Sequence, residues 1–256
     1  MNNTEEEIQS LINKKALFIV NHSGGKDSQA MFIKIRSLVP RAQIHVIHAH
    51  LSGVEWEGVI EHIDETCEGY STQVVKANKT LFEMARHRQK WPSPKYRQCT
   101  SDLKRGPIEK AVRHELKKRG LFLVVNCMGL RAEESSNRAK KEVFKYNARN
   151  SKAGREWYDW LPIHDYEEDR VFSTIEDAGE TPHWAYEAGM TRLSCCFCIM
   201  ASKQDLRTAA MLYPELYAEY VSLEKEIGHT LMMPSKGIAL GLEAITGIRA
   251  GIQCCA

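Results

Sequence analysis

The segment ALFIVNHSGGKDS at residues 16–28 decides the fold of this chain. Its first five residues are apolar and have the length of a buried strand, and the apolar spacing that begins at Ala30 indicates a helix ending near Pro40. A glycine-rich turn between a buried strand and a helix is typical of α/β proteins that bind anions at the helix N-terminus. The segment therefore predicts a parallel sheet covered by helices.

The alternation of apolar runs and helical patterns continues along the chain. Further strands are predicted at residues 43–50, 72–76 and 121–127, and helices at residues 56–67, 81–87, 107–119, 170–178, 203–213 and from 214 onward. Residues 138–155 are polar and basic, and we interpret them as a lid over a site. We predict an α/β fold with a parallel, Rossmann-like sheet in a domain at residues 1–190. A small, mainly helical, cysteine-containing extension at residues 191–256 is expected to pack on that domain.

Length and composition are those of an ordinary globular protein. The chain has 256 residues, of which 43% are hydrophobic, enough for a full core. No stretch approaches the roughly 18 apolar residues of a membrane span, and the first residues are acidic, so a cytoplasmic protein with no membrane partner is expected. Eight cysteines in such a protein indicate a metal, a cluster or sulfur chemistry.

Charge is distributed unevenly although the formal net charge is only +2. Residues 86–119 hold twelve Lys or Arg against three acids, and residues 138–155 hold seven against one. Residues 156–187 instead hold ten acids and a single Arg170. Clustered cations favour a polyanion, and a solvated helix surface is the alternative reading of each basic run.

The turn itself has the composition of a phosphate-binding loop. Its glycines let a phosphate approach the backbone, Ser23 and Ser28 offer hydroxyl donors, and Lys26 offers a cation. It differs from a Walker A loop because Asp27 stands where that motif needs Ser or Thr for magnesium. We therefore expect a nucleotide loop of another class.

The loop SGGKDS resembles the signature of the N-type ATP pyrophosphatases, a superfamily with an adenine nucleotide alpha hydrolase-like fold that includes the 3′-phosphoadenylylsulfate (PAPS) reductases. The resemblance implies ATP as cofactor, cleaved to AMP and pyrophosphate with Mg²⁺. It also implies that Asp27 helps to place magnesium. The residues expected to bind ATP in the loop are Ser23, Gly24, Gly25, Lys26, Asp27 and Ser28.

Two further segments extend the resemblance over most of the chain. Residues 49–56 (AHLSGVEW) occupy the family's adenine and ribose region, which implies a role for His50. Residues 129–135 (GLRAEES) are similar to the family's Gly-Ile-Arg-x-x-Glu-Ser segment and include Gly129. Arg131 and Arg138 are natural ligands of a phosphate or an adenylate, because a guanidinium pairs with oxyanions. Lys26, Asp27 and Arg131 are the expected catalytic residues.

The cysteine pattern indicates a metal site. Cys195 and Cys198 have the two-residue gap that lets two thiolates bind one metal, and Cys99 is the expected third ligand. The fourth ligand stays open between Cys196 and a more distant cysteine such as Cys127. Iron–sulfur cluster, zinc and unligated thiols are the alternatives.

The segments RQCTSDLKRGP and SCCFC resemble the sulfur-inserting component of DNA phosphorothioation systems of the Dnd and Ssp type. The resemblance implies a bound cluster, DNA as a partner, a cysteine desulfurase as sulfur donor and further phosphorothioation components. The Glu-Cys-Gly-Leu-His tail expected of assimilatory PAPS reductases is not found, since residues 251–256 read GIQCCA. Cys254 and Cys255 are either persulfide carriers or incidental thiols.

We predict an ATP pyrophosphatase and sulfurtransferase that adenylates an oxyanion acceptor, with a DNA backbone phosphate as the first choice. The alternatives are a phosphoadenylylsulfate or adenylylsulfate reductase-like enzyme, a transfer RNA thiolase, and a nucleotide-binding module without catalysis. DNA, RNA and a small sulfonucleotide all present oxyanions, so the sequence leaves the acceptor open. It also leaves open whether the chain forms a homo-oligomer.

Overall fold

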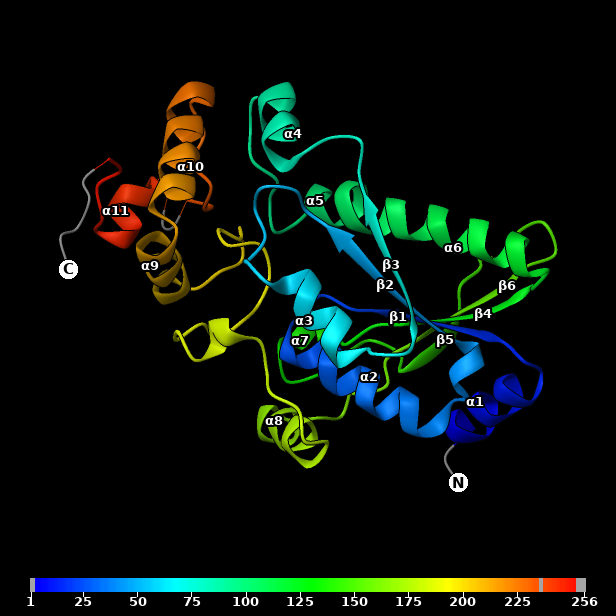
Figure 1. Ribbon diagram of the computed structural model, residues 1–256. Helices are drawn as coiled ribbons and strands as arrows, with labels where there is room; N and C mark the ends of the chain where they lie inside the picture. Colours follow the sequence, from blue (N-terminus) through cyan, green and yellow to red (C-terminus); the bar gives the residue numbers. More distant parts are fainter. Residues whose placement is uncertain (1–2, 235–236, 252–256) are drawn as a thin grey trace. The chain divides into compact units, whose positions relative to one another are not determined.

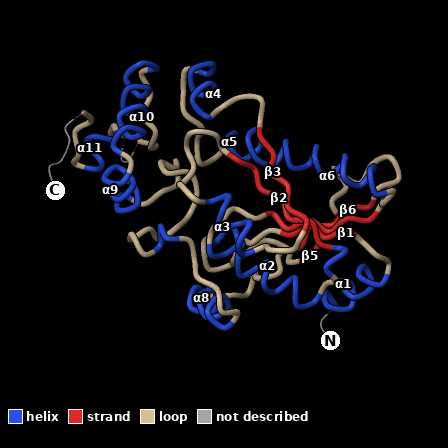
Figure 2. Tube along the Cα trace, viewed as in Figure 1, coloured by secondary structure: helices blue, strands red, loops and turns tan. Residues whose placement is uncertain are grey.

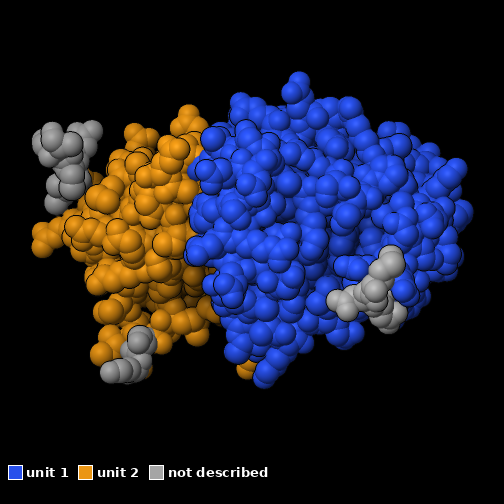
Figure 3. Space-filling model, turned by 90° about the horizontal axis from the view of Figure 1, so that it is seen from below, with its two compact units in different colours: residues 1–48, 58–75, 108–183 blue, residues 49–57, 76–107, 184–256 orange. Residues whose placement is uncertain are grey.

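The computed structural model describes residues 3–234 and 237–251, and contacts within the chain divide it into two compact units (Figure 3). Unit 1 comprises residues 1–48, 58–75 and 108–183, and unit 2 comprises residues 49–57, 76–107 and 184–256. Unit 2 is therefore assembled from three separate stretches of chain. The predicted domain boundary between residues 190 and 191 stays a prediction.

Unit 1 contains a six-stranded sheet with the order β3-β2-β1-β4-β6-β5 (Figure 2). β2, β1, β4 and β6 form parallel pairs, and β5 pairs antiparallel with β6 at one edge. The bounds are β1 (Leu17–Asn21), β2 (Ile44–His50), β3 (Ser71–Lys76), β4 (Leu123–Cys127), β5 (Phe144–Tyr146) and β6 (Glu156–Trp160). This sheet confirms the predicted parallel α/β fold.

Helices cover both faces of the sheet, as predicted, with α2 on one face and α6 on the other (Figure 1). The helices of unit 1 are α1 (Asn3–Asn13), α2 (Lys26–Leu38), α3 (Val59–Thr66), α6 (Gly106–Arg119), α7 (Ser136–Ala139) and α8 (Glu168–Asp177). Those of unit 2 are α4 (Leu81–Arg88), α5 (Gln98–Thr100), α9 (Lys203–Leu212), α10 (Pro214–Ile227) and α11 (Leu242–Thr246). Short 3-10 turns cover Arg41–Gln43 and Trp184–Tyr186, and a π-helical turn covers Ser101–Arg105.

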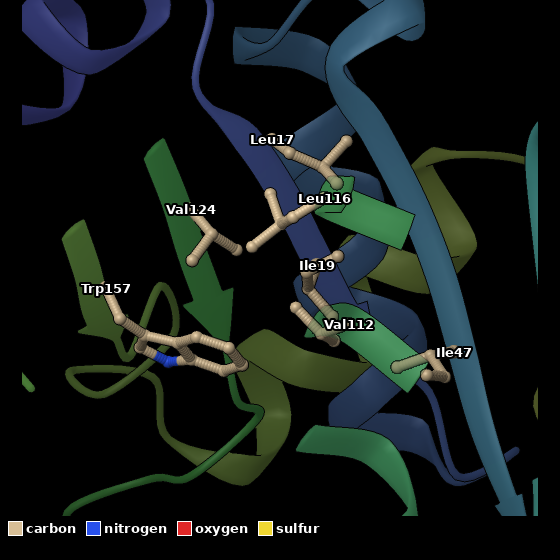
Figure 4. Packing of buried hydrophobic residues seen from close by; sticks show 7 residues of the cluster. All are labelled: Leu17, Ile19, Ile47, Val112, Leu116, Val124 and Trp157. Atoms are coloured by element: carbon tan, nitrogen blue, oxygen red, sulfur yellow. The ribbon is translucent and has the colours of Figure 1, made fainter. Parts of the chain in front are cut away.

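The core of unit 1 follows from the two-residue period of its strands. Alternate residues of a strand point to one face, so Leu17 and Ile19 of β1 face the same side as Val124 and Trp157 of the neighbouring strands. Figure 4 shows Val112 and Leu116 of α6 packing onto them, together with Ile47. Each of these side chains is at most 1% exposed. Burial of each such side chain contributes about 1.5–3 kcal/mol, so this packing fixes α6 on the sheet.

The elements that were not predicted from the sequence include α1, β5 and β6. β6 begins at an acid, Glu156, and a second acid, Asp159, interrupts its aromatic residues, and both acids lie within the acidic run of residues 156–187. The expected lid at residues 138–155 instead contains part of α7 and all of β5. Its backbone is used in sheet pairing, which a polar sequence does not reveal.

Within the described residues, we find no helix with both the length and the apolar character to cross a membrane.

Candidate active site

The turn between β1 and α2 forms the predicted loop. Gly24 has φ of 76°, in the left-handed region that glycine adopts without strain. Gly25 is the N-cap of α2, and no side chain caps the helix there. The N–H groups of the first turn therefore have no intrahelical acceptor, and the positive end of the helix dipole lies beside them. An anion is the natural partner of this helix end.

Ser28 holds the loop in shape from inside the helix. Its Oγ accepts the Ser23 N–H at 3.1 Å and donates to the Gly25 carbonyl at 2.8 Å. The Ser23 and Ser28 hydroxyl oxygens lie 3.2 Å apart. Ser28 is buried, whereas Ser23 is exposed. Of the two predicted hydroxyls, Ser28 is thus the structural one and Ser23 is accessible to a ligand.

The segment after β4 lies against this loop. A Cβ on Gly129 would stand 2.9 Å from the Asp27 carbonyl oxygen and 3.2 Å from the Ser28 nitrogen, so only glycine fits here. Arg131, 4% exposed, donates from Nε to Asp27 Oδ1 at 2.6 Å, and its guanidinium also pairs with Glu133. The structure therefore brings Asp27, Gly129 and Arg131 together.

Lys26 and Arg138 also have carboxylate partners. Lys26 Nζ lies 3.0 Å from Glu168 Oε1, and the lysine side chain is 3% exposed while the glutamate is 50% exposed. Arg138 pairs with Glu134, and the carboxylate of Glu134 also accepts the backbone N–H of Arg131 at 3.1 Å. Among these ion pairs of the described residues, the three cations thus meet the four carboxylates of Asp27, Glu133, Glu134 and Glu168, a surplus of one negative charge.

His50 belongs to unit 2, whereas the other residues predicted to bind ATP belong to unit 1. Its Nδ1 lies 2.6 Å from Glu55 Oε2, within unit 2. The role of His50 in nucleotide binding stays a prediction.

Three of the predicted metal ligands meet in unit 2. Cys99 lies in α5, and Cys195 and Cys198 lie in the irregular segment before α9. The Cys195 thiol hydrogen-bonds to Cys198 and lowers the pKa of Cys198 to about 5. Cys99 interacts electrostatically with both. The structure therefore groups the Cys99 thiol with those of Cys195 and Cys198, although roughly a hundred residues separate Cys99 from that pair in sequence. The two-residue gap between Cys195 and Cys198 is typical of thiolate metal sites.

The role of Cys196 as the fourth ligand stays a prediction. Its thiol is buried, and burial raises its pKa to about 12. Cys127 lies in β4 of unit 1, where its thiol donates to the Val125 carbonyl at 3.7 Å. The fourth ligand is therefore unassigned, and Cys254 and Cys255 lie outside the described residues.

Comparison with known proteins identifies the family. Residues 18–201 match the phosphoadenosine phosphosulfate reductase domain, so the matched span runs from β1 past Cys198. The chain belongs to the phosphoadenosine phosphosulfate reductase domain family. This assignment covers the loop, the arginine segment and the three grouped cysteines.

The relatives of this reductase-domain protein are distant. An uncharacterised 37.8 kDa protein of Escherichia phage 186 is 25% identical over 85% of this chain and 79% of its own length. An uncharacterised protein of Methanocaldococcus jannaschii is also 25% identical over 85% of this chain, which spans half of that protein. Among solved structures, the phosphate complex of phosphoadenylyl-sulfate reductase from Candida auris has a TM-score of 0.49 at 12% identity, covering 74% of this chain and 86% of that one. FMN adenylyltransferase from Candida glabrata has a TM-score of 0.47 at 14% identity, covering 76% and 57%.

His22 is a site residue of this reductase-domain protein that sequence reasoning missed. It is 2% exposed, and its Nδ1 accepts the Gly24 N–H at 3.1 Å. Burial, together with His62 and His48 nearby, lowers its pKa to about 3, so the ring is neutral at physiological pH. Nδ1 is then the acceptor and the proton is on Nε2, which has no partner among the described residues. The sequence around His22 has no pattern from which this role could have been predicted.

A row of polar side chains at the carboxyl ends of the strands was missed as well. Asn21 of β1 donates to Asn126 of β4 at 2.7 Å, and Asn126 donates to Asp159 of β6 at 2.9 Å. Asn147, just after β5, donates to the other Asp159 oxygen at 2.8 Å. Asn21 immediately precedes His22, so this polar ladder anchors the strand end from which the loop departs. Its members lie far apart in sequence and are joined only by the strand register.

Proposed function

We propose that this protein is an ATP pyrophosphatase that adenylates a DNA backbone phosphate, so that one of its oxygens can be replaced by sulfur. The observation that carries the proposal is the uncapped N-terminus of α2, with Lys26 on its first turn and Arg131 paired to Asp27 beside it. Such a helix end binds phosphates, and a guanidinium neutralises charge on a phosphorus undergoing displacement. Membership of the reductase-domain family supports an adenylyl nucleotide as the ligand.

The charges around the loop support Mg²⁺ as the companion of ATP. Four carboxylates face three cations there, so a polyphosphate alone would meet a net negative set of side chains. Carboxylate oxygens are the protein ligands that Mg²⁺ takes, usually together with substrate phosphates. Asp27 lies on the loop itself and would hold the ion, and Arg131, which pairs with Asp27, would supply positive charge beside the bound phosphates. Mg²⁺ would supply charge neutralisation on the leaving pyrophosphate.

The proposed reaction has two displacements at phosphorus. A non-bridging oxygen of the DNA phosphate attacks the α-phosphorus of ATP, and the bond to the β-phosphate oxygen breaks to release pyrophosphate. The terminal sulfur of a persulfide, supplied by a cysteine desulfurase partner, then attacks the DNA phosphorus and AMP leaves. A second thiol reduces the remaining sulfur–sulfur bond, which yields the phosphorothioate and a disulfide. Lys26 and Arg131 position and neutralise the phosphates in the first step.

The three grouped thiols are soft ligands that suit an iron–sulfur cluster, which we propose, and zinc is the alternative for the same residues. Cys99, Cys195 and Cys198 would hold the cluster, which supplies one-electron redox chemistry beside the sulfur-transfer step. Lys104 and Arg192, which interact with these thiols, stabilise their charged forms.

A basic and aromatic surface in unit 2 supports a nucleic acid as the acceptor. Tyr96 is 67% exposed, with Lys95 Nζ 5.4 Å from the centre of its ring, and Arg97 follows in an exposed position. An exposed aromatic ring between cations is a platform for a base, with the cations on the phosphate backbone. A sulfonucleotide reductase is the second candidate, because the matching family model carries that description.

The proposal is tested by measuring pyrophosphate release from ATP by the purified protein with Mg²⁺, with and without DNA. We expect release that depends on DNA, and its loss in Asp27→Asn and Ser23→Ala. Asp64→Asn, a change at an exposed acid of α3, is the matched control and should keep the activity. Absence of release with DNA and Mg²⁺ would refute the adenylation step, and turnover of phosphoadenylylsulfate with thioredoxin instead would establish the reductase.

A further inference from the structure

Tyr220 of α10 is enclosed by aromatic side chains in unit 2. It is 0% exposed and stacks on Trp91, with ring centres 5.2 Å apart and planes within 5°. The rings of Phe82 and Phe197 approach it to 4.8 Å and 4.9 Å. Such packing fixes the position and direction of the phenol, because the ring cannot turn without displacing its neighbours.

The hydroxyl of Tyr220 has no hydrogen-bond partner among the described residues. A buried hydroxyl without a partner costs about 1–3 kcal/mol, and native proteins rarely leave one in that state. A water, an ion or a bound group normally meets such a hydroxyl. The surroundings of Tyr220 decide which of these applies.

The Tyr220 phenol has the grouped cysteines among its neighbours. Phe197, which packs on Tyr220, stands between Cys196 and Cys198 in the chain. The phenol interacts electrostatically with four cysteines, Cys195, Cys196, Cys198 and Cys99. A tyrosine hydroxyl is an O–H donor at neutral pH. A fixed donor thus lies beside a set of sulfur ligands.

We propose that Tyr220 donates its hydroxyl hydrogen to a sulfur of the iron–sulfur group held by Cys99, Cys195 and Cys198, and thereby sets the reduction potential of that group. The inference rests on the cluster in the proposed function. A hydrogen bond to a cluster sulfur stabilises the extra negative charge of the reduced form, so it raises the potential. Tyr220 is a positioning and tuning residue and takes part in no bond-making step.

Tyr217, one turn earlier on α10, provides a matched control. It is 1% exposed and its ring lies 5.6 Å from that of Phe197, so it shares the environment of Tyr220. Its hydroxyl, however, is already bonded, 2.8 Å from Thr246 Oγ1 and 2.8 Å from the Ile248 carbonyl. Replacing either tyrosine with phenylalanine removes one oxygen from the same helix, and only Tyr220 loses a donor available to the cluster.

The experiment is an anaerobic redox titration of the reconstituted full chain, followed by its visible absorption, for wild type, Tyr220→Phe and Tyr217→Phe. Tyr220→Phe is expected to move the midpoint to a more negative potential with unchanged iron and sulfide content. Tyr217→Phe is expected to keep the wild-type midpoint and to lower only the thermal stability. Equal midpoints in wild type and Tyr220→Phe, or equal shifts in both variants, would overturn the inference. Wild type that takes up zinc or no metal would overturn the cluster as well, and pyrophosphate release measured on the same sample shows whether adenylation survives.

Discussion

At the scale of single residues, Gly129 decides how closely two segments of backbone meet at the loop. A Cβ there would collide with the Asp27 carbonyl oxygen and carbon, at 2.9 Å and 3.1 Å. Because both are backbone atoms, Gly129→Ala must displace the first turn of α2. We expect ATP affinity to fall about tenfold or more, since forced backbone shifts cost about 1–3 kcal/mol and 1.4 kcal/mol is tenfold. Isothermal titration calorimetry with a non-hydrolysable ATP analogue measures the affinity of each protein.

Gly179 serves as the control for Gly129. It has φ of 70° and nothing within 4 Å of the added Cβ, so alanine there brings backbone strain without a collision. Gly179→Ala should lower the unfolding free energy by about 1 kcal/mol and leave ATP affinity unchanged. Equal ATP affinity in Gly129→Ala and wild type would show that the loop tolerates the displacement.

His22 makes the stability of the fold dependent on pH. Its pKa is about 3 in the folded protein against 6.5 for an ordinary histidine, so the unfolded chain binds more protons between these values. Stability is therefore full above pH 6.5 and is lost as pH falls toward 3. The pKa of His62, lowered to about 4, acts in the same direction.

Urea unfolding at pH 7.5, 6.5 and 5.5 tests this expectation for His22. Carboxylates titrate mainly below this range, so the histidines dominate the change. Wild type should lose stability between pH 6.5 and pH 5.5, and His22→Asn should lose less over the same interval. A pH dependence identical in the two proteins would mean that His22 is not held neutral by the fold.

At the scale of secondary-structure elements, the polar ladder joins β1, β4 and β6. Asp159, 9% exposed, accepts the amide hydrogens of Asn126 and Asn147. Asp159→Ala would leave both amides without their acceptor. We expect a loss of about 2–6 kcal/mol in unfolding free energy, at about 1–3 kcal/mol for each of the two stranded groups. Asp64→Ala on the exposed side of α3 should change it by less than about 0.5 kcal/mol, and thermal or denaturant unfolding compares the two.

The elements also show how far the sequence predicts this structure. β1, α2 and the loop were predictable because their patterns are local: an apolar run, two glycines and a helical period. β6 was missed because Asp159 interrupts its run of apolar residues. That acid belongs to the polar ladder, whose members lie as far apart in sequence as Asn21 and Asp159. The same holds for His22, whose role depends on burial by other segments. Cys99, Cys195 and Cys198 were nevertheless predicted to lie together, from the two-residue gap of the last two, and the structure groups them, while their role as metal ligands stays a prediction.

At the scale of the whole molecule, unit 2 is made of three stretches of chain that alternate in sequence with the stretches of unit 1. Cys99 lies in one of them, and Cys195 and Cys198 lie in the last. A metal group bound by these residues closes a loop of roughly 100 residues, which in a chain-entropy estimate stabilises the fold by up to about 4–5 kcal/mol. If the proposed iron–sulfur cluster is bound, anaerobic removal of its iron by a chelator should lower the melting temperature measured by calorimetry. The Cys99→Ser variant should have the lower melting temperature even before the chelator is added, and the chelator should not change that temperature.

The separation of Cys99 from its partners also sets the order of events during synthesis. At about 5–20 residues per second, Cys99 leaves the ribosome roughly 5–20 seconds before Cys195. Throughout that interval its thiol lacks the partners Cys195 and Cys198, while β4 and β6 are made and join the sheet. If the proposed iron–sulfur group is bound, it therefore enters a chain whose sheet-containing unit has already been made, so its loading would be a late step that a cell short of iron would leave unfinished on otherwise complete protein.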